Sequence, residues 1–153
     1  MQLKPRLFLD TSALFAGIWS AEGGARMLLR LGEAEAVQIL VSSQVLQEIE
    51  EVVRRKAAHH LPTLAVLIDR SRASVVTAAP ADVLARCQAL IVHPGDARIL
   101  ADAWHGQAEY LVTLDKAHFL DLPGLAGSIP FPLGTPGDCL SWYRGKLLER
   151  QAL

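Results

Sequence analysis

Short apolar runs alternate with longer segments of helical periodicity along this chain. The apolar runs predict strands at residues 7–9, 37–41, 74–77, 110–113 and 128–131. Helices are predicted between and after them, at residues 12–18, 25–32, 45–59, 63–71, 81–90, 96–106 and 138–149. Strands that alternate with helices favour a parallel sheet covered on both faces. We therefore expect an α/β fold with one domain over residues 1–153 and a small central sheet of four or five parallel strands.

Two acidic residues follow predicted strands, Asp10 after the first and Asp115 after the fourth. Ligands of open parallel sheets bind beyond the carboxyl ends of the strands, so both side chains are candidates for a site. Asp96, at the start of a predicted helix, lies at the centre of the face that buries the apolar side chains, whereas Asp102 is expected to point away. A carboxylate on a core-facing stripe is unusual unless it caps the helix, pairs or binds a cation.

A glutamate of the predicted helix 45–59 is the fourth candidate. Glu48 and Glu50 flank the apolar stripe of this helix on opposite sides, and helical geometry does not choose between them. Each acid has an ordinary explanation on its own, because Asp10 and Asp96 fit N-caps and Asp115 fits a turn. Carboxylates that converge, however, raise one another's pKa and call for a cation. Mg²⁺ or Mn²⁺ is expected with carboxylate and water ligands, and such ions activate water for phosphodiester hydrolysis.

Composition and charge narrow the class of protein. The chain has 153 residues, of which 51% are hydrophobic, and this excludes a disordered protein. Fifteen basic residues against sixteen acidic ones argue against coating a nucleic acid by bulk charge. Cys87 and Cys139 lie far apart, so neither a disulfide framework nor a zinc site is expected. No apolar run is long enough to span a bilayer, and we expect a soluble, cytoplasmic protein.

Four segments in order carry a family resemblance: LFLDTSALFAG, SSQVLQEIEEVV, HPGDARILADA and YLVTLDKAHF. In these segments the chain resembles the PIN-domain ribonucleases and is similar to VapC-type toxins, from about residue 6 to residue 136. The resemblance implies a single PIN-like domain and metal-dependent cleavage of single-stranded or structured RNA, leaving 5′-phosphate and 3′-hydroxyl ends. It also implies an antitoxin protein as a possible partner, and a homodimer. The apolar helix 25–32 independently favours a homodimer.

The resemblance also assigns roles to particular residues. Asp10, Glu48, Asp96 and Asp115 match the four acids of the family and are the expected catalytic and metal-binding residues, with Mg²⁺ or Mn²⁺ as the ion. Thr11 or Ser12 matches the position that helps to hold the first carboxylate, and Thr113 matches a frequent small hydroxyl residue. His93 and Gly95 depart from the family, since many relatives carry acids in this loop.

The candidate RNA-binding residues and the alternative functions follow from single residues and not from a motif. Phosphate contacts need local cations, and the candidates are Arg54, Arg55, Lys56, Lys116 and His118. Of the three tryptophans, Trp19 is the candidate for stacking on a base. Phosphatases and receiver domains that also place an aspartate after the first strand need a further acid near it, and position 12 is Ser. The remaining alternatives are a non-catalytic PIN-like module that binds RNA or protein, and a housekeeping RNA-processing nuclease.

Overall fold

The computed structural model describes residues 4–152. Its strands are β1 (Arg6–Leu9), β2 (Gln38–Val41), β3 (Ser74–Val75), β4 (Tyr110–Val112) and β5 (Leu133–Gly134). Its helices are α1 (Thr11–Trp19), α2 (Gly24–Glu33), α3 (Ser43–Ala57), α4 (Leu61–Arg70), α5 (Ala81–Gln88), α6 (Pro94–His105), α7 (Leu125–Ser128) and α8 (Pro136–Ala152). Two short turns of helix, η1 (Ala58–His60) and η2 (Lys116–Leu120), complete the described chain. Within it, no helix has both the length and the apolar character needed to cross a membrane.

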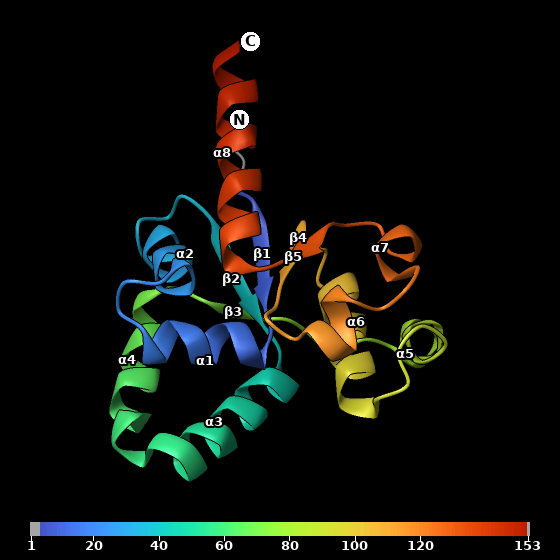
Figure 1. Ribbon diagram of the computed structural model, residues 1–153, viewed down its shortest axis with the longest axis horizontal. Helices are drawn as coiled ribbons and strands as arrows, with labels where there is room; N and C mark the ends of the chain where they lie inside the picture. The colour runs from blue at the N-terminus through green and yellow to red at the C-terminus, as the bar shows by residue number, and fades with distance from the viewer. Residues whose placement is uncertain (1–3, 153) are drawn as a thin grey trace.

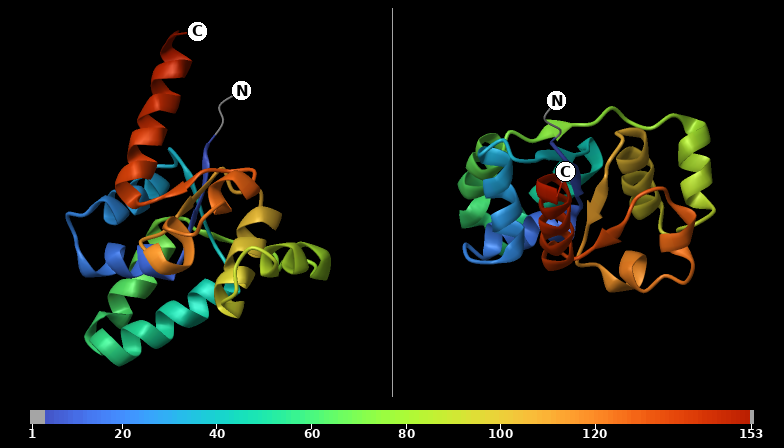
Figure 2. Two further views of the ribbon diagram at one scale, coloured as in Figure 1. Left: turned by 45° about the vertical axis from the view of Figure 1, so that its right-hand side comes forward. Right: turned by 90° about the horizontal axis from the view of Figure 1, so that it is seen from above.

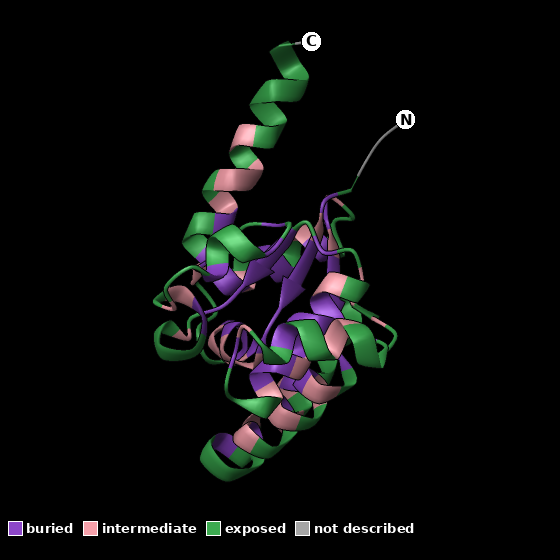
Figure 3. Ribbon diagram, turned by 90° about the vertical axis from the view of Figure 1, so that its right-hand side faces the viewer, coloured by how far each residue is buried: buried purple, intermediate pink, exposed green. Residues whose placement is uncertain are grey.

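The five strands form one parallel sheet in the order β3-β2-β1-β4-β5. The central strand β1 pairs Leu7 with Ile39 of β2 and with Tyr110 of β4. Leu7, Phe8 and Leu9 are completely buried, because helices cover both faces of the sheet at this central strand (Figure 3), whereas the edge strand β3 is exposed. The predicted α/β architecture with a parallel five-stranded sheet is confirmed.

The helices divide into two layers. Figures 1 and 2 show α1 to α4 on one face of the sheet and α5 to α7 on the other. The base of α8 packs against α2 and β5, and the rest of this helix projects away from the sheet (Figure 1). The connections from β1 and from β4 therefore leave toward opposite faces, and these two strands are neighbours. Such a reversal opens a crevice beyond the carboxyl ends of the two strands.

Side chains just ahead of the helices fix where the helices around this crevice begin. The Asp10 carboxylate caps α1 by accepting from the Ala13 N–H, and the Ser42 hydroxyl caps α3 by accepting from the Val45 N–H. For α6 the predicted cap was wrong: the cap is His93, whose Nδ1 accepts from the Asp96 N–H at 3.3 Å. Asp96 itself lies inside the first turn of α6.

Two other expectations from the sequence are wrong. The predicted strand 128–131 is displaced to β5, because the sheet contact begins at the Pro132 carbonyl, which accepts from the Leu111 N–H. Asp102 does not point away but is buried, where it accepts from the Ala79 N–H and lies 3.5 Å from the Arg98 guanidinium. Within α2, Leu28 and Leu29 are buried in the chain itself while Met27 is 43% exposed, and the homodimer stays a prediction.

Candidate metal centre

Asp10 is the most enclosed carboxylate at the carboxyl edge of the sheet. It directly follows β1, and only 3% of its surface is exposed. Oδ1 accepts from the Ala13 N–H at 2.9 Å and from the Ser12 hydroxyl at 2.7 Å, while Oδ2 accepts from the Thr113 hydroxyl. Burial raises the pKa of Asp10 to about 6, although these three hydrogen bonds oppose the rise.

Two hydroxyl groups tie the end of β1 to the segment after β4. Ser12 Oγ accepts from the Leu114 N–H at 2.9 Å, and Thr113 Oγ1 accepts from the Asp115 N–H at 3.0 Å. Since both hydroxyls also donate to Asp10, the carboxylates of Asp10 and Asp115 are held by one continuous network. Of the two predicted supporting residues next to Asp10, it is Ser12 that contacts this carboxylate.

Glu48 brings a third carboxylate to the edge from α3. Its Oε1 accepts from the Thr11 hydroxyl at 3.1 Å, and its Oε2 accepts from the Gln44 amide at 3.0 Å. Glu50, which helical geometry had left as an alternative, is exposed and pairs with Arg54 at 2.7 Å. The structure therefore turns Glu48, and not Glu50, toward Asp10.

Asp96 supplies the fourth carboxylate, from the first turn of α6. This residue is 8% exposed, and Oδ2 is a buried oxygen that accepts no hydrogen bond from the described residues. Oδ2 lies 2.9 Å from Nδ1 of His118 and 3.2 Å from Nδ1 of His93. Burial raises the pKa of Asp96, the two histidines oppose this, and the negative charges of Asp115 and Glu48 add to it.

Asp115 completes the group after β4, where it caps η2. Its Oδ1 accepts from the His118 N–H at 3.0 Å, and its Oδ2 lies 3.0 Å from the ring nitrogen Nδ1 of the same residue. His118 was not placed among the acidic residues from the sequence, because nothing in the sequence around it indicates that it lies close to Asp96. Gln44 was also missed, although it precedes Glu48 by four residues on the same helix and could have been noticed for that spacing.

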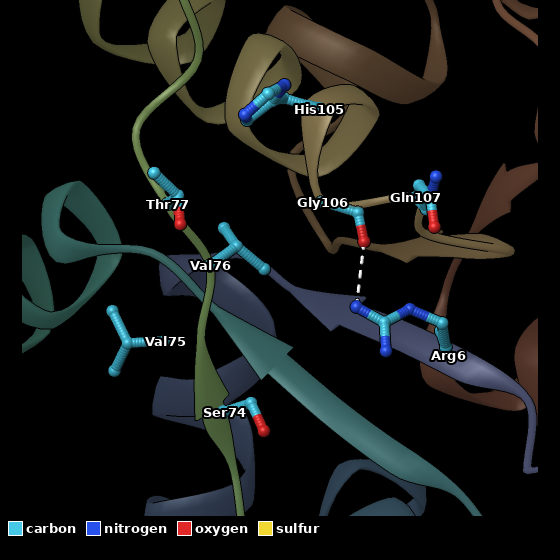
Figure 4. Close-up of a pocket in the computed structure, with 8 residues that line it drawn as sticks. All are labelled: Arg6, Ser74, Val75, Val76, Thr77, His105, Gly106 and Gln107. Carbon is cyan, nitrogen blue, oxygen red and sulfur yellow. Dashed lines mark hydrogen bonds between the residues drawn. The ribbon is translucent and has the colours of Figure 1, made fainter.

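These carboxylates share one cavity of about 310 Å³. It is lined by Asp10, Thr11, Ser12, Phe15, Glu48, Val52, Lys56, Asp96, Ile99 and Asp115. Another cavity, of about 320 Å³, lies at the opposite end of the sheet, where β1 begins, and there Arg6 donates to the Gly106 carbonyl at 2.9 Å (Figure 4). None of the eight described residues that line it carries a carboxylate, so the acids gather at the carboxyl edge.

The donor set at this edge fits a divalent cation. One ligand atom each from Asp96, Asp115 and His118 lies within 4.8 Å of the others. Asp96 Oδ2 is buried without a hydrogen bond from the described residues, and the nearby ring nitrogens of His93 and His118 offset its charge only when they are protonated. A bound cation would offset this charge with both rings neutral. Oxygen-rich sites of this kind suit small divalent ions.

The cationic residues predicted to contact RNA are dispersed. Lys56 lines the acidic cavity and lies 5.9 Å above the Phe15 ring, while Arg55 and Lys116 are exposed. Arg54 belongs to another cavity, between α3 and α4, and His118 lies among the acids. Trp19 is 61% exposed and does not line the acidic cavity, but it stacks on Phe15, which does, with 5.9 Å between the ring centroids.

Several solved structures of known proteins are similar to this architecture. No curated protein is significantly similar to the chain in sequence. Among solved structures, VapBC2 from Rickettsia felis bound to a promoter DNA fragment is 20% identical, with a TM-score of 0.62 over 85% of this chain and 98% of that one. DNA-bound VapBC from Salmonella typhimurium is 18% identical, with a TM-score of 0.64 over 86% and 98%.

VapC20 from Mycobacterium tuberculosis, described as a sarcin-ricin loop cleaving toxin, is also similar in structure. It is 20% identical, with a TM-score of 0.51 over 72% of this chain and 90% of that one. These likenesses concern the fold. The family model of the PIN domain matches residues 6–117, a span that contains all four carboxylates of the cavity. The chain belongs to the PIN domain family.

Proposed function

We propose that this protein is a divalent-metal-dependent endoribonuclease of the VapC-like toxin kind. The observation that carries the proposal is the buried Asp96 Oδ2, which accepts no hydrogen bond from the described chain and faces the carboxylates of the cavity. Membership of the PIN family and the likeness to VapC20, described as a sarcin-ricin loop cleaving toxin, support the same activity. Mg²⁺ and Mn²⁺ are the ions proposed for the site.

The four carboxylates would have different roles in the reaction. Asp10, Asp96 and Asp115 would hold the ion, which when bound lowers the pKa of water and offsets charge on a phosphate. Glu48 is fixed by Thr11 and Gln44, so it is oriented to position the attacking water and to accept its proton. The Lys56 ammonium at the rim would contact a phosphate of the strand being cut.

Asp96→Asn and Asp10→Asn test the proposal directly. Each change keeps the shape of the side chain but removes a negatively charged ligand of the ion. Cleavage of a labelled RNA in Mg²⁺ or Mn²⁺ should therefore fall by roughly a hundredfold or more, because losing a direct ligand costs more than losing a residue that only supports a ligand. Asp69→Asn, on the exposed face of α4, is the matched control and should cut like the parent protein. Full activity of both site variants would overturn the assignment.

The same assay distinguishes a nuclease from a protein that binds RNA without cutting it. Metal-dependent cleavage that is lost in EDTA supports the nuclease, whereas RNA binding that never leads to cleavage in either ion favours a non-catalytic PIN-like protein.

We also propose an antitoxin protein as a partner, because two similar structures contain VapBC. The homodimer stays a prediction, which sedimentation of the purified chain would test.

A further inference from the structure

His118 occupies the point where the carboxylates of Asp96 and Asp115 meet. Its Nδ1 lies 2.9 Å from Asp96 Oδ2 and 3.0 Å from Asp115 Oδ2. The backbone N–H of His118 donates to the other oxygen of Asp115, so η2 fixes the ring against this carboxylate. An imidazole nitrogen is therefore built into a group of atoms that otherwise consists of carboxylate oxygens.

These separations match those between neighbouring ligands of one metal ion. Ligand bonds of about 2.1 Å at right angles place the two ligand atoms about 3.0 Å apart. Both nitrogen–oxygen distances have this length. Asp96 Oδ2 also accepts no hydrogen bond from His118 in the described structure, although it is buried beside the ring. The two imidazole nitrogens beside this buried oxygen offset its charge only when they are protonated, and a cation bound between Asp96, Asp115 and His118 would offset it with the rings neutral.

His93 lies almost as close to Asp96 but is occupied differently. Its Nδ1 is 3.2 Å from Asp96 Oδ2, yet the same nitrogen accepts from the Asp96 N–H as the cap of α6. Its lone pair is therefore directed at the helix. The ring stacks on His118 with 5.1 Å between centroids and 21° between planes. The Nδ1 of His93 is thus engaged by the helix cap, whereas Nδ1 of His118 faces two carboxylates.

We propose that His118 contributes a nitrogen ligand, so that the site binds a divalent transition-metal ion such as Mn²⁺ in preference to Mg²⁺. The inference rests on the proposed metal site and names its selectivity. Carboxylates and water serve Mg²⁺ well, while imidazole favours the transition ions.

The test measures metal binding without RNA, on the full chain after removal of metal. Mn²⁺ is titrated by electron paramagnetic resonance, Mg²⁺ is measured by competition, and electron spin echo modulation detects nitrogen bonded to Mn²⁺. The parent protein should bind Mn²⁺ at least about tenfold more tightly than Mg²⁺ and should show imidazole coupling. His118→Asn should lose the coupling and most of the preference, because an amide oxygen replaces the nitrogen.

His93→Asn is the matched control, since asparagine also caps a helix and the change removes a histidine at nearly the same distance from Asp96. It should keep both the coupling and the preference. Equal affinity of the parent protein for the two ions, or absence of nitrogen coupling in it, would overturn the proposal, and neither result depends on how the variants fold. Loss of the coupling in His93→Asn but not in His118→Asn would assign the nitrogen to His93 instead. Because RNA cleavage is assayed separately, a failure of the nuclease proposal remains distinguishable from a failure of this one.

Discussion

At the scale of single residues, the fold holds Asp10 in a form suited to a cation. Three donors, from Ser12, Ala13 and Thr113, fix the carboxylate in place but do not offset its burial, and the pKa remains raised to about 6. A positive ion would remove this penalty, because it stabilises the ionised form. Without an ion, the folded chain keeps this carboxyl protonated up to about pH 6, well above the ordinary value of 3.8.

The raised pKa of Asp10 predicts how stability depends on pH. The folded value of about 6 exceeds the ordinary 3.8, so the favourable contribution is complete below pH 3.8 and is lost as the pH rises through 6. Asp10→Asn resembles the protonated form and escapes this loss. In EDTA, the free energy of unfolding of the parent protein should fall relative to the variant by up to about 3 kcal/mol between pH 4 and pH 7.5. Urea unfolding at several pH values measures the difference.

Asp69→Asn serves as the control for that comparison, because the replaced carboxyl is exposed on α4. Its stability relative to the parent protein should stay nearly constant over the same interval. A difference between Asp10→Asn and the parent protein that does not change with pH would contradict the argument.

At the scale of elements, close contacts between helices and strands decide where small residues are needed. Gly32 is buried near the end of α2, against the backbone of Ser71 after α4. A Cβ at this position would lie 2.5 Å from the Ser71 carbonyl oxygen and 2.7 Å from Cγ1 of Ile39 in β2. The backbone of Ser71 cannot yield as a flexible side chain would, so this position tolerates only glycine.

Gly32→Ala should therefore destabilise the protein by about 1–3 kcal/mol, in spite of the higher helix propensity of alanine. Gly145→Ala is the matched control in α8, where an added Cβ meets nothing in the described chain. There the change should stabilise the helix by up to about 1 kcal/mol. Thermal unfolding of both variants would show shifts of opposite sign, and equal shifts would contradict the packing argument.

The sequence predicts the elements near the centre of the sheet better than those at its border. The run Leu7–Leu9 reads as a buried strand because it is apolar without interruption, and β1 covers it. At the border, β3 and β5 have only two residues each, so their position depends on which carbonyl or N–H of the neighbouring strand is free. Periodicity along α6 likewise could not place Asp102, because its burial comes from the segment around Ala79.

At the scale of the whole molecule, the candidate site exists only where separate parts of the fold meet. Asp10 and Asp115 come from neighbouring strands and Glu48 and Asp96 from helices on either side, so no local motif contains the site. The strand ends could be recognised in the sequence because parallel strands finish at a common edge. Helical periodicity left Glu48 and Glu50 open, and only the family resemblance chose Glu48. The place of His118 depends on the packing of η2, which the sequence pattern does not specify.

A binding ion should stabilise this assembly as a whole. Ligands that bind only the folded state raise its stability, by about 2.7 kcal/mol at a hundred times the dissociation constant, which corresponds to roughly 5–10 °C in the melting temperature. Mn²⁺ added to the metal-free protein should produce a shift of this kind. Asp96→Asn should melt above the parent protein in EDTA, because a buried charge is removed, but below it in saturating Mn²⁺. Identical melting shifts on adding Mn²⁺ in both proteins would argue against Asp96 as a ligand.

The pairing of β1 with β4 also sets an order of events during synthesis. Asp10 leaves the ribosome early, but its partner Thr113 lies 103 residues further along the chain. A nascent chain therefore carries the first carboxylate for most of its elongation without the segment that completes the cluster. On this arrangement the candidate metal site is completed late and in one step, when β4 joins the sheet, so a truncated translation product that ends before residue 110 would lack it.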